Sequence, residues 1–214
     1  KGQREGSAPH QIIMSATPIP RSLTMVMYAD MDLSVIDEMP PGRQPVETVV
    51  LPNTRREDVQ ARIREACARE RRAYWVCPLI EDSDVLAVQA ATSRAEALKA
   101  ELPELRIALL HGKIPSAQKD QIMDDFRQGR VDVLVATTVI EVGVDVPEAS
   151  LMVIENAERL GLSQLHQLRG RVGRGDQKSV CVLMYQPPLG HNAKERLATM
   201  RQSTDGFAIA QKDL

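Results

Sequence analysis

The sequence has few aromatic residues and few cysteines, and each shortage argues against a class of function. Aromatic residues make up 3% of the 214 residues, which is too few for extensive stacking of nucleic-acid bases on Phe, Tyr or Trp. The three cysteines, Cys67, Cys77 and Cys181, are far apart and form no CxxC pair. Neither a disulfide framework nor a metal site is therefore predicted. We interpret the thiols as buried groups in a reducing cytosol.

Long apolar runs, a signal peptide and a strong net charge are also missing. No segment approaches the length of a membrane span, so no membrane partner is expected. The net charge of −2 does not indicate nucleic-acid binding, although a local basic patch can bind without a basic total. No G-x-G-x-x-G follows a strand, which argues against a dinucleotide-binding enzyme, and no G-x-x-x-x-G-K-[ST] phosphate loop is present.

Strand and helix patterns alternate along the chain from residue 46 onward. Strands are predicted at 46–51, 74–79, 106–110, 131–136, 151–154 and 180–185, and helices at 55–69, 85–102, 116–128, 192–202 and 205–214, with another helix, capped by Ser163, carrying the arginines near residue 170. Runs such as Val131–Ala136 are almost continuously apolar, as in buried parallel strands. The pattern predicts an α/β fold with a mostly parallel sheet and helices on both faces.

The two ends of the sequence indicate a piece of something longer. The chain begins at Lys1 rather than Met and stops at Leu214 inside a predicted helix. Residues 37–52 contain four prolines and Gly42, a composition typical of a linker that leads into a new unit. We therefore expect a fragment with a linker near its start.

The segment Gln167–Arg174 holds three arginines and two glycines. Gln167, Arg171 and Arg174 are spaced four and then three apart, so a helix would place them on one face. Two guanidiniums aimed at one point suit a phosphate, which they can bind bidentately.

A solvated basic helix face is the simpler interpretation of the arginines, but it does not explain the glycines between them. Gly170 and Gly173 would each cost roughly 1 kcal/mol relative to Ala inside a helix. They make sense if a phosphate or another domain must come close, so the sequence favours a binding role for this segment.

Two more segments with polar side chains follow predicted strands, where open parallel sheets bind ligands. They are His111-Gly112-Lys113 and the stretch containing Thr137, Thr138, Glu141, Gly143 and Asp145. Threonine hydroxyls and backbone N–H groups can bind phosphates without reading sequence. An ordinary strand connection with a locally hydrogen-bonded Asp, and a structural His111, are the alternatives. No nucleophile or metal cluster accompanies the two acids to suggest acid–base chemistry.

Three segments of the sequence resemble the motifs of superfamily 2 helicases and translocases. Gln167–Arg174 resembles motif VI, Q-x-x-G-R-x-G-R; Val135–Pro147 is similar to motif V; and Ser15–Thr17 is similar to motif III. The continuation Pro18–Arg21 resembles the branch that contains RecG and the transcription-repair coupling factor. Residues 28–30, 34–38, 40–43, 139–147 and 205–214 are closer to the RecG-like enzymes. The resemblance covers the chain from about Pro9 to its end.

The resemblance implies a RecA-like lobe, followed by a C-terminal helical hairpin, within a two-lobe motor. Such motors hydrolyse ATP between their lobes and move on duplex DNA, and RecG-like enzymes remodel branched DNA and stalled replication forks in the bacterial cytoplasm, at the nucleoid. By motif, the resemblance implies that Arg171 and Arg174 act as arginine fingers and that Gln167 orders them. The residues expected near the nucleotide are Gly143, Asp145 and Gly170, and those expected to contact DNA are Thr137, Thr138, His111 and Gly112. Coupling between the lobes is expected of Ser15 and Thr17.

The chain departs from the family by lacking a phosphate loop and an acidic magnesium motif. The resemblance therefore implies that ATP and Mg²⁺ are held mainly by a first lobe outside this sequence. It also implies a second partner in the same protein, the oligonucleotide-binding wedge domain of RecG-like enzymes. Residues 1–45 would be the end of the first lobe with the interlobe linker, 46–188 the second lobe, and 189–214 the start of a helical translocation element. We expect no activity from the chain alone. The alternative is a non-catalytic module that binds nucleic acid or protein.

Overall fold

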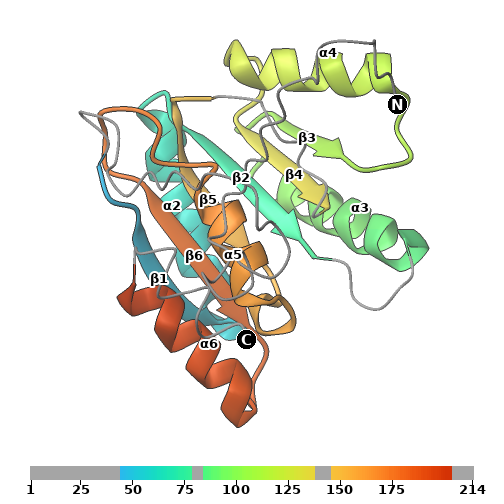
Figure 1. The fold of residues 1–214 in the computed structure, drawn as a ribbon. Coiled ribbons are helices and arrows are strands. Elements are labelled where there is room, and N and C mark those ends of the chain that lie inside the picture. Colours follow the sequence, from blue (N-terminus) through green and yellow to red (C-terminus); the bar gives the residue numbers. More distant parts are fainter. Residues whose placement is uncertain (1–43, 79–83, 138–145, 204–214) are drawn as a thin grey trace, which may run out of the picture.

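The computed structural model describes residues 44–78, 84–137 and 146–203, which form a sheet covered by helices (Figure 1). The strands are β1 (Glu47–Pro52), β2 (Arg72–Cys77), β3 (Ile107–Leu110), β4 (Val133–Thr137), β5 (Ala149–Ile154) and β6 (Val180–Tyr185). The helices are α2 (Arg56–Ala68), α3 (Asp84–Glu101), α4 (Ser116–Arg127), α5 (Leu162–Arg169) and α6 (His191–Gln202), with the short 3-10 helices η1 (Asn53–Arg55) and η2 (Ala157–Arg159).

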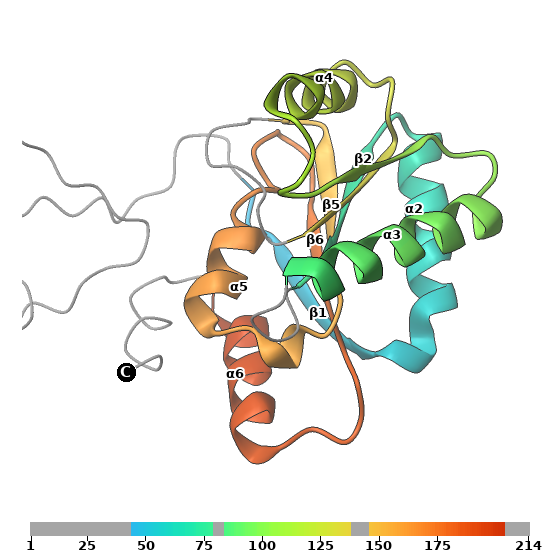
Figure 2. The same cartoon turned by 90° about the vertical axis from the view of Figure 1, so that its right-hand side faces the viewer.

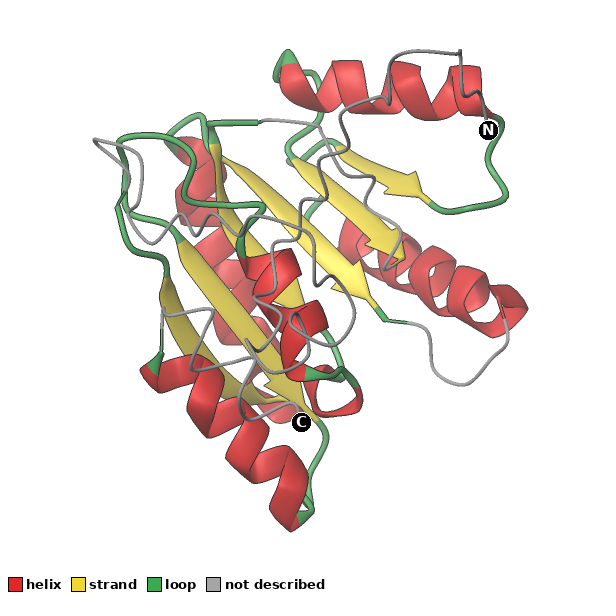
Figure 3. Cartoon of the chain, in the orientation of Figure 1, coloured by secondary structure: helices red, strands yellow, loops and turns green. Residues whose placement is uncertain are grey.

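The six strands are ordered β1-β6-β5-β2-β4-β3, and every pairing is parallel. Their arrows therefore point the same way in Figure 3. This confirms the predicted α/β class with a parallel central sheet. The carboxyl ends of all six strands share one edge, which is where open sheets of this kind bind ligands.

Helices cover both faces of the sheet because the side chains of each strand alternate between them. On β2, Tyr74 and Val76 pack with residues of α4, α5 and α6, whereas Trp75 and Cys77 pack with residues of α2 and α3. Figure 2 shows α5 and α6 on one side of the sheet and α2 and α3 on the other. The result is a three-layer domain with an apolar core on each side of the sheet.

Most element boundaries agree with the sequence patterns, but the start of α5 does not. Ser163 was predicted to cap this helix, whereas the helix begins at Leu162 after Gly161. The Gly161 N–H donates to Oε1 of Gln164 at 3.2 Å, so a glutamine side chain satisfies the first backbone donor. The predicted helix at 205–214, and with it the second helix of the predicted C-terminal hairpin, lies outside the described residues.

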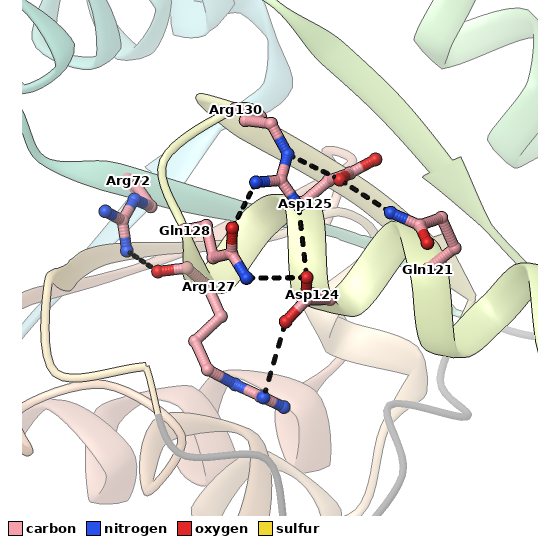
Figure 4. Close-up of polar contacts among 7 residues, drawn as sticks. All are labelled: Arg72, Gln121, Asp124, Asp125, Arg127, Gln128 and Arg130. Atoms are coloured by element: carbon pink, nitrogen blue, oxygen red, sulfur yellow. Dashed lines mark hydrogen bonds and ion pairs between the residues drawn. The ribbon is translucent and has the colours of Figure 1, made fainter.

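A polar network closes the end of α4, at the amino-terminal edge of the sheet (Figure 4). Arg72 begins β2 and donates from Nη1 to the Arg127 carbonyl at 2.9 Å. Arg130 donates to Asp125 Oδ1 at 2.7 Å and Asp124 Oδ2 at 3.1 Å. The network joins α4 to the amino-terminal end of β2.

Candidate functional site

The ends of β3 and β4 bring two of the predicted segments together. Leu110, the last residue of β3, pairs with Ala136 of β4, so His111 and Thr137 follow at neighbouring strand ends. These two segments therefore share the carboxyl edge of the sheet, as their order suggested. The arginine segment does not share it, because its turn packs on Val46 and Pro147, which precede β1 and β5 at the amino-terminal edge. Thr137 is still part of β4 and is buried, with only 4% of its surface exposed.

His111 lies half-buried in a basic turn. Its Nδ1 atom is buried and has no hydrogen-bond partner in the described part of the chain. Burial lowers the pKa of His111 below 6.5, and the charges of Lys113 and Lys119 lower it further. The imidazole is therefore neutral at pH 7, and the positive charge of this surface comes from the two lysines.

Gly112 is exposed, and a Cβ placed on it would meet nothing within 4 Å. The backbone of this turn is therefore open to a ligand. Neither lysine was among the predicted site residues. Lys113 is two residues from His111, so it could have been found. Lys119 lies in the first turn of α4, which begins at Ser116 just after this turn.

The arginine segment departs from the prediction, because α5 ends at Arg169. Gly170 closes the helix, and its N–H donates to the His166 carbonyl at 3.0 Å. Arg171 and Arg174 lie in the turn that follows, so the prediction of one helical face shared with Gln167 is wrong. Gly173 has φ of +76°, a left-handed conformation that cannot continue a right-handed helix.

The two arginines of this turn are nevertheless close together. Burial lowers the pKa of Arg171, the charge of Arg174 lowers it further, and Tyr74 raises it. Arg171 is half-buried, and no carboxylate pairs with it among the described residues. Arg174 is exposed and donates from Nε to the Gly170 carbonyl at 3.3 Å. Two neighbouring guanidiniums form a good site for phosphate oxygens.

Gln167 is exposed on the last turn of α5, just before these arginines. The other predicted site residues, Ser15, Thr17, Thr138, Gly143 and Asp145, lie outside the described residues, as does Glu141.

Gly173, and Gly175 just beyond the segment, leave room for this chain's own residues. A Cβ on Gly173 would lie 2.5 Å from Cγ2 of Val46, and a Cβ on Gly175 would lie 2.8 Å from the Pro147 carbonyl oxygen. A Cβ on Gly170 would make only ordinary contacts. For Gly173, the interpretation that it makes room for a ligand or a second domain therefore needs correction. Gly170 ends the helix, and Gly173 lets the turn pack on the start of β1.

Sequence reasoning missed two buried charged groups, one at the carboxyl ends of the strands and one near their amino ends. Glu155 follows β5 and pairs with Arg56 and Arg94, each with Nη2 3.0 Å from Oε1. Arg94 also lies over the Trp75 ring, 5.8 Å from its centroid. This group ties α2 and α3 to the carboxyl end of β5. The second group is Arg169, whose surface is 5% exposed. Arg169 is four residues from buried Leu165, and this helical spacing is the one sequence signal that could have predicted its burial.

The described part of the chain shows neither a metal-binding cluster nor a membrane-spanning helix. No group of three or more His, Cys, Asp and Glu side chains there could hold a metal ion. No helix within it is long and apolar enough to cross a membrane.

The helicase conserved C-terminal domain family matches residues 56–176 of the chain. This segment contains β2 to β5, α5 and the arginine turn, and it makes up more than half of the chain. The chain belongs to this helicase family.

Comparison with individual proteins narrows the resemblance to RecG. The chain is 62% identical to the ATP-dependent DNA helicase RecG of Escherichia coli O157:H7, over 100% of the chain and 31% of the relative. It is 50% identical to RecG of Thermotoga maritima, over 98% of the chain and 27% of that relative. The resemblance to RecG is thereby confirmed, and this helicase domain spans less than a third of the length of these relatives.

Solved structures agree with this assignment. A structure of RecG bound to a three-way DNA junction matches the helicase domain with a TM-score of 0.80 and 48% identity, over 94% of this chain and 26% of that one. The yeast DEAD-box splicing factor Prp28 matches with a TM-score of 0.60 and 20% identity, over 91% and 41% of the two chains. The second match shows the fold alone and confirms the predicted RecA-like class.

Proposed function

We propose that the chain is the second motor lobe of an ATP-dependent DNA helicase similar to RecG, with Arg171 and Arg174 as its arginine fingers. The observation that carries this proposal is the pair of neighbouring guanidiniums in one turn, with no described carboxylate paired to Arg171. ATP supplies the phosphoryl group that is transferred to water. The two arginines bind its phosphate oxygens and stabilise the charge that develops during transfer.

The proposed site is completed by a first lobe, which supplies the phosphate loop and the Mg²⁺ ligands that this sequence lacks. We assign residues 1–45 to the end of that lobe and the linker, 46–188 to the second lobe, and 189–214 to the start of the translocation element. Ser15 and Thr17 couple the lobes, Gln167 orders the arginines, and Gly143, Asp145 and Gly170 approach the nucleotide. The chain alone is accordingly inactive.

The proposed substrate is branched or duplex DNA in the bacterial cytoplasm, because a similar RecG structure holds a three-way junction. His111, Gly112, Thr137 and Thr138 contact the DNA backbone, with Lys113 supplying charge. Because Thr137 is buried, we assign the direct phosphate contact to Thr138. Backbone contacts of this kind position DNA without reading its sequence.

DNA-stimulated ATPase of the full-length protein tests the arginine fingers. Arg171→Ala and Arg174→Ala should each lower kcat by roughly 10³-fold or more, the usual contribution of an arginine finger. Arg62→Ala is the matched control, since Arg62 is exposed on α2, across the sheet, and should keep wild-type turnover. Near-normal turnover in both finger variants would exclude the assignment.

A mixing experiment tests whether the site is divided between lobes. The isolated chain should show no ATPase, and adding the separately produced first lobe should restore DNA-dependent hydrolysis. Hydrolysis by the chain alone contradicts the division. DNA binding with no activity in any mixture supports the alternative function, a non-catalytic binding module.

A further inference from the structure

Arg169 is a buried cation next to the proposed fingers. It is the last residue of α5, and 5% of its surface is exposed. Burial lowers the pKa of its guanidinium, and no carboxylate pairs with it among the described residues. A buried charge is costly unless hydrogen bonds replace its hydration. The hydrogen-bond partners of Arg169 therefore indicate which elements its side chain holds together.

These partners lie on three separate elements. Nη1 donates to the carbonyl oxygens of Met200 at 2.9 Å and Ser203 at 2.8 Å, and to Oγ1 of Thr48 on β1 at 3.3 Å. Nη2 lies 3.4 Å from Nδ1 of His166, one turn back on α5. The two carbonyls belong to the end of α6, where a cation is favourable because the helix dipole is negative there. A single side chain thus joins α5, α6 and β1.

The backbone of Arg169 connects this junction to the arginine turn. The Arg171 N–H donates to the Leu168 carbonyl at 3.0 Å, and the Val172 N–H donates to the Arg169 carbonyl at 3.3 Å. The end of α5 and the first residues of the turn are therefore one hydrogen-bonded unit. Gly173 then packs on Val46, just before β1. Both ends of the turn are thus held against the start of the domain, by Arg169 at one end and by Gly173 at the other.

We propose that Arg169 is a positioning residue for the ATPase reaction: its guanidinium fixes the end of α5 against α6 and β1 and so aims Arg171 at the nucleotide phosphates. The inference rests on the proposed function, because it requires Arg171 to be a finger. Arg169 itself contacts neither ATP nor DNA. Its effect is on geometry, and a misplacement of about 1 Å can cost up to about 100-fold in rate.

The decisive experiment is a double-mutant cycle in the full-length protein between Arg169→Lys and Arg171→Ala. A lysine keeps the charge, but one ammonium cannot hold three elements in the geometry of a planar guanidinium. Arg169→Lys should lower the kcat of the DNA-stimulated ATPase by roughly 10- to 100-fold, with little change in KM for ATP or in DNA affinity. In the Arg171→Ala background the same change should have almost no further effect, because its target is gone.

Thr48→Val provides a second, milder variant in case Arg169→Lys does not fold. It removes a single acceptor from the junction, and its smaller loss of kcat should also vanish in the Arg171→Ala background. Equal losses in both backgrounds would mean a general defect of folding and would overturn the inference, as would full activity of Arg169→Lys. In both of those cases an inactive Arg171→Ala still supports the proposed function. If Arg171→Ala is active, the proposed function fails first.

Discussion

Arg169 and Arg171 are two residues apart, yet their guanidinium groups differ in burial and in hydrogen-bond partners. Arg169 is enclosed by backbone carbonyls and Thr48, whereas Arg171 has no described carboxylate partner. The sequence pattern could indicate that arginines here bind phosphate. It could not separate the two roles, because the separation arises where Gly170 ends the helix and turns the chain.

Both the backbone conformation of Gly173 and the close packing around it favour glycine at this position. Gly173→Ala should lower the free energy of unfolding by about 2 kcal/mol or more, because the residue has a positive φ and its Cβ would overlap Val46. Gly190→Ala is the control, since Gly190 has φ of −67° and open space around it. Urea unfolding measures both. Adding Val46→Ala should recover part of the loss at Gly173, and equal stability of the two glycine variants would contradict the explanation.

His111 should make stability depend on pH. Its pKa in the folded protein lies below the ordinary 6.5 because of burial and two lysines, so the unfolded chain takes up the proton first. The stability that this neutral imidazole contributes is present above about pH 6.5 and is lost as the pH falls through its folded pKa. Unfolding free energies between about pH 8 and pH 5 should therefore fall more steeply for the wild type than for His111→Asn. Parallel curves would exclude this role.

Among the elements, those with a strong apolar period were predicted well. In α2, Val59 and Ile63 are buried as their spacing indicates, and Gly129 follows α4 with φ of +75°. The arginine helix was predicted too long because spacings of four and three describe a helix only while the backbone remains helical. The group around Glu155 could not be predicted, since Arg56 and Glu155 are 99 residues apart and meet only in the folded sheet.

The Glu155 group should be sensitive to the loss of its acid. Glu155→Gln leaves Arg56 and Arg94 beside one another without a counter-charge, and their side chains are only 29% and 20% exposed. We expect a loss of about 2–4 kcal/mol in unfolding free energy, less than for a fully buried pair because water still screens the arginines. Glu65→Gln, which breaks an exposed pair with Arg69, should have a much smaller effect. Equal losses in thermal or urea unfolding would contradict the importance of burial.

The whole molecule has a net charge of −2, yet the turn that contains His111 and Lys113, at the carboxyl edge of the sheet, is basic. If that turn contacts DNA phosphates, Lys113→Ala in the full-length protein should weaken binding at all sequences. It should also reduce the slope of log K against log salt by about one. Lys99→Ala, near the end of α3, is the control and should leave the slope unchanged. DNA titrations at several salt concentrations measure both, and an unchanged slope for Lys113→Ala would remove this turn from the interface.

The edge position of β1 has a consequence for how the protein is made. In the described sheet β1 pairs with β6 alone, in a register that joins Glu47 to Val180. Of the six strands in this sheet, β1 is made first and β6 last, so β1 cannot pair until β6 has been made. Loop closure over such a span is slow, so during synthesis the central strands are free to assemble first. The arginine turn, which packs on Val46 just before β1, therefore acquires its final shape only after β6 has been made.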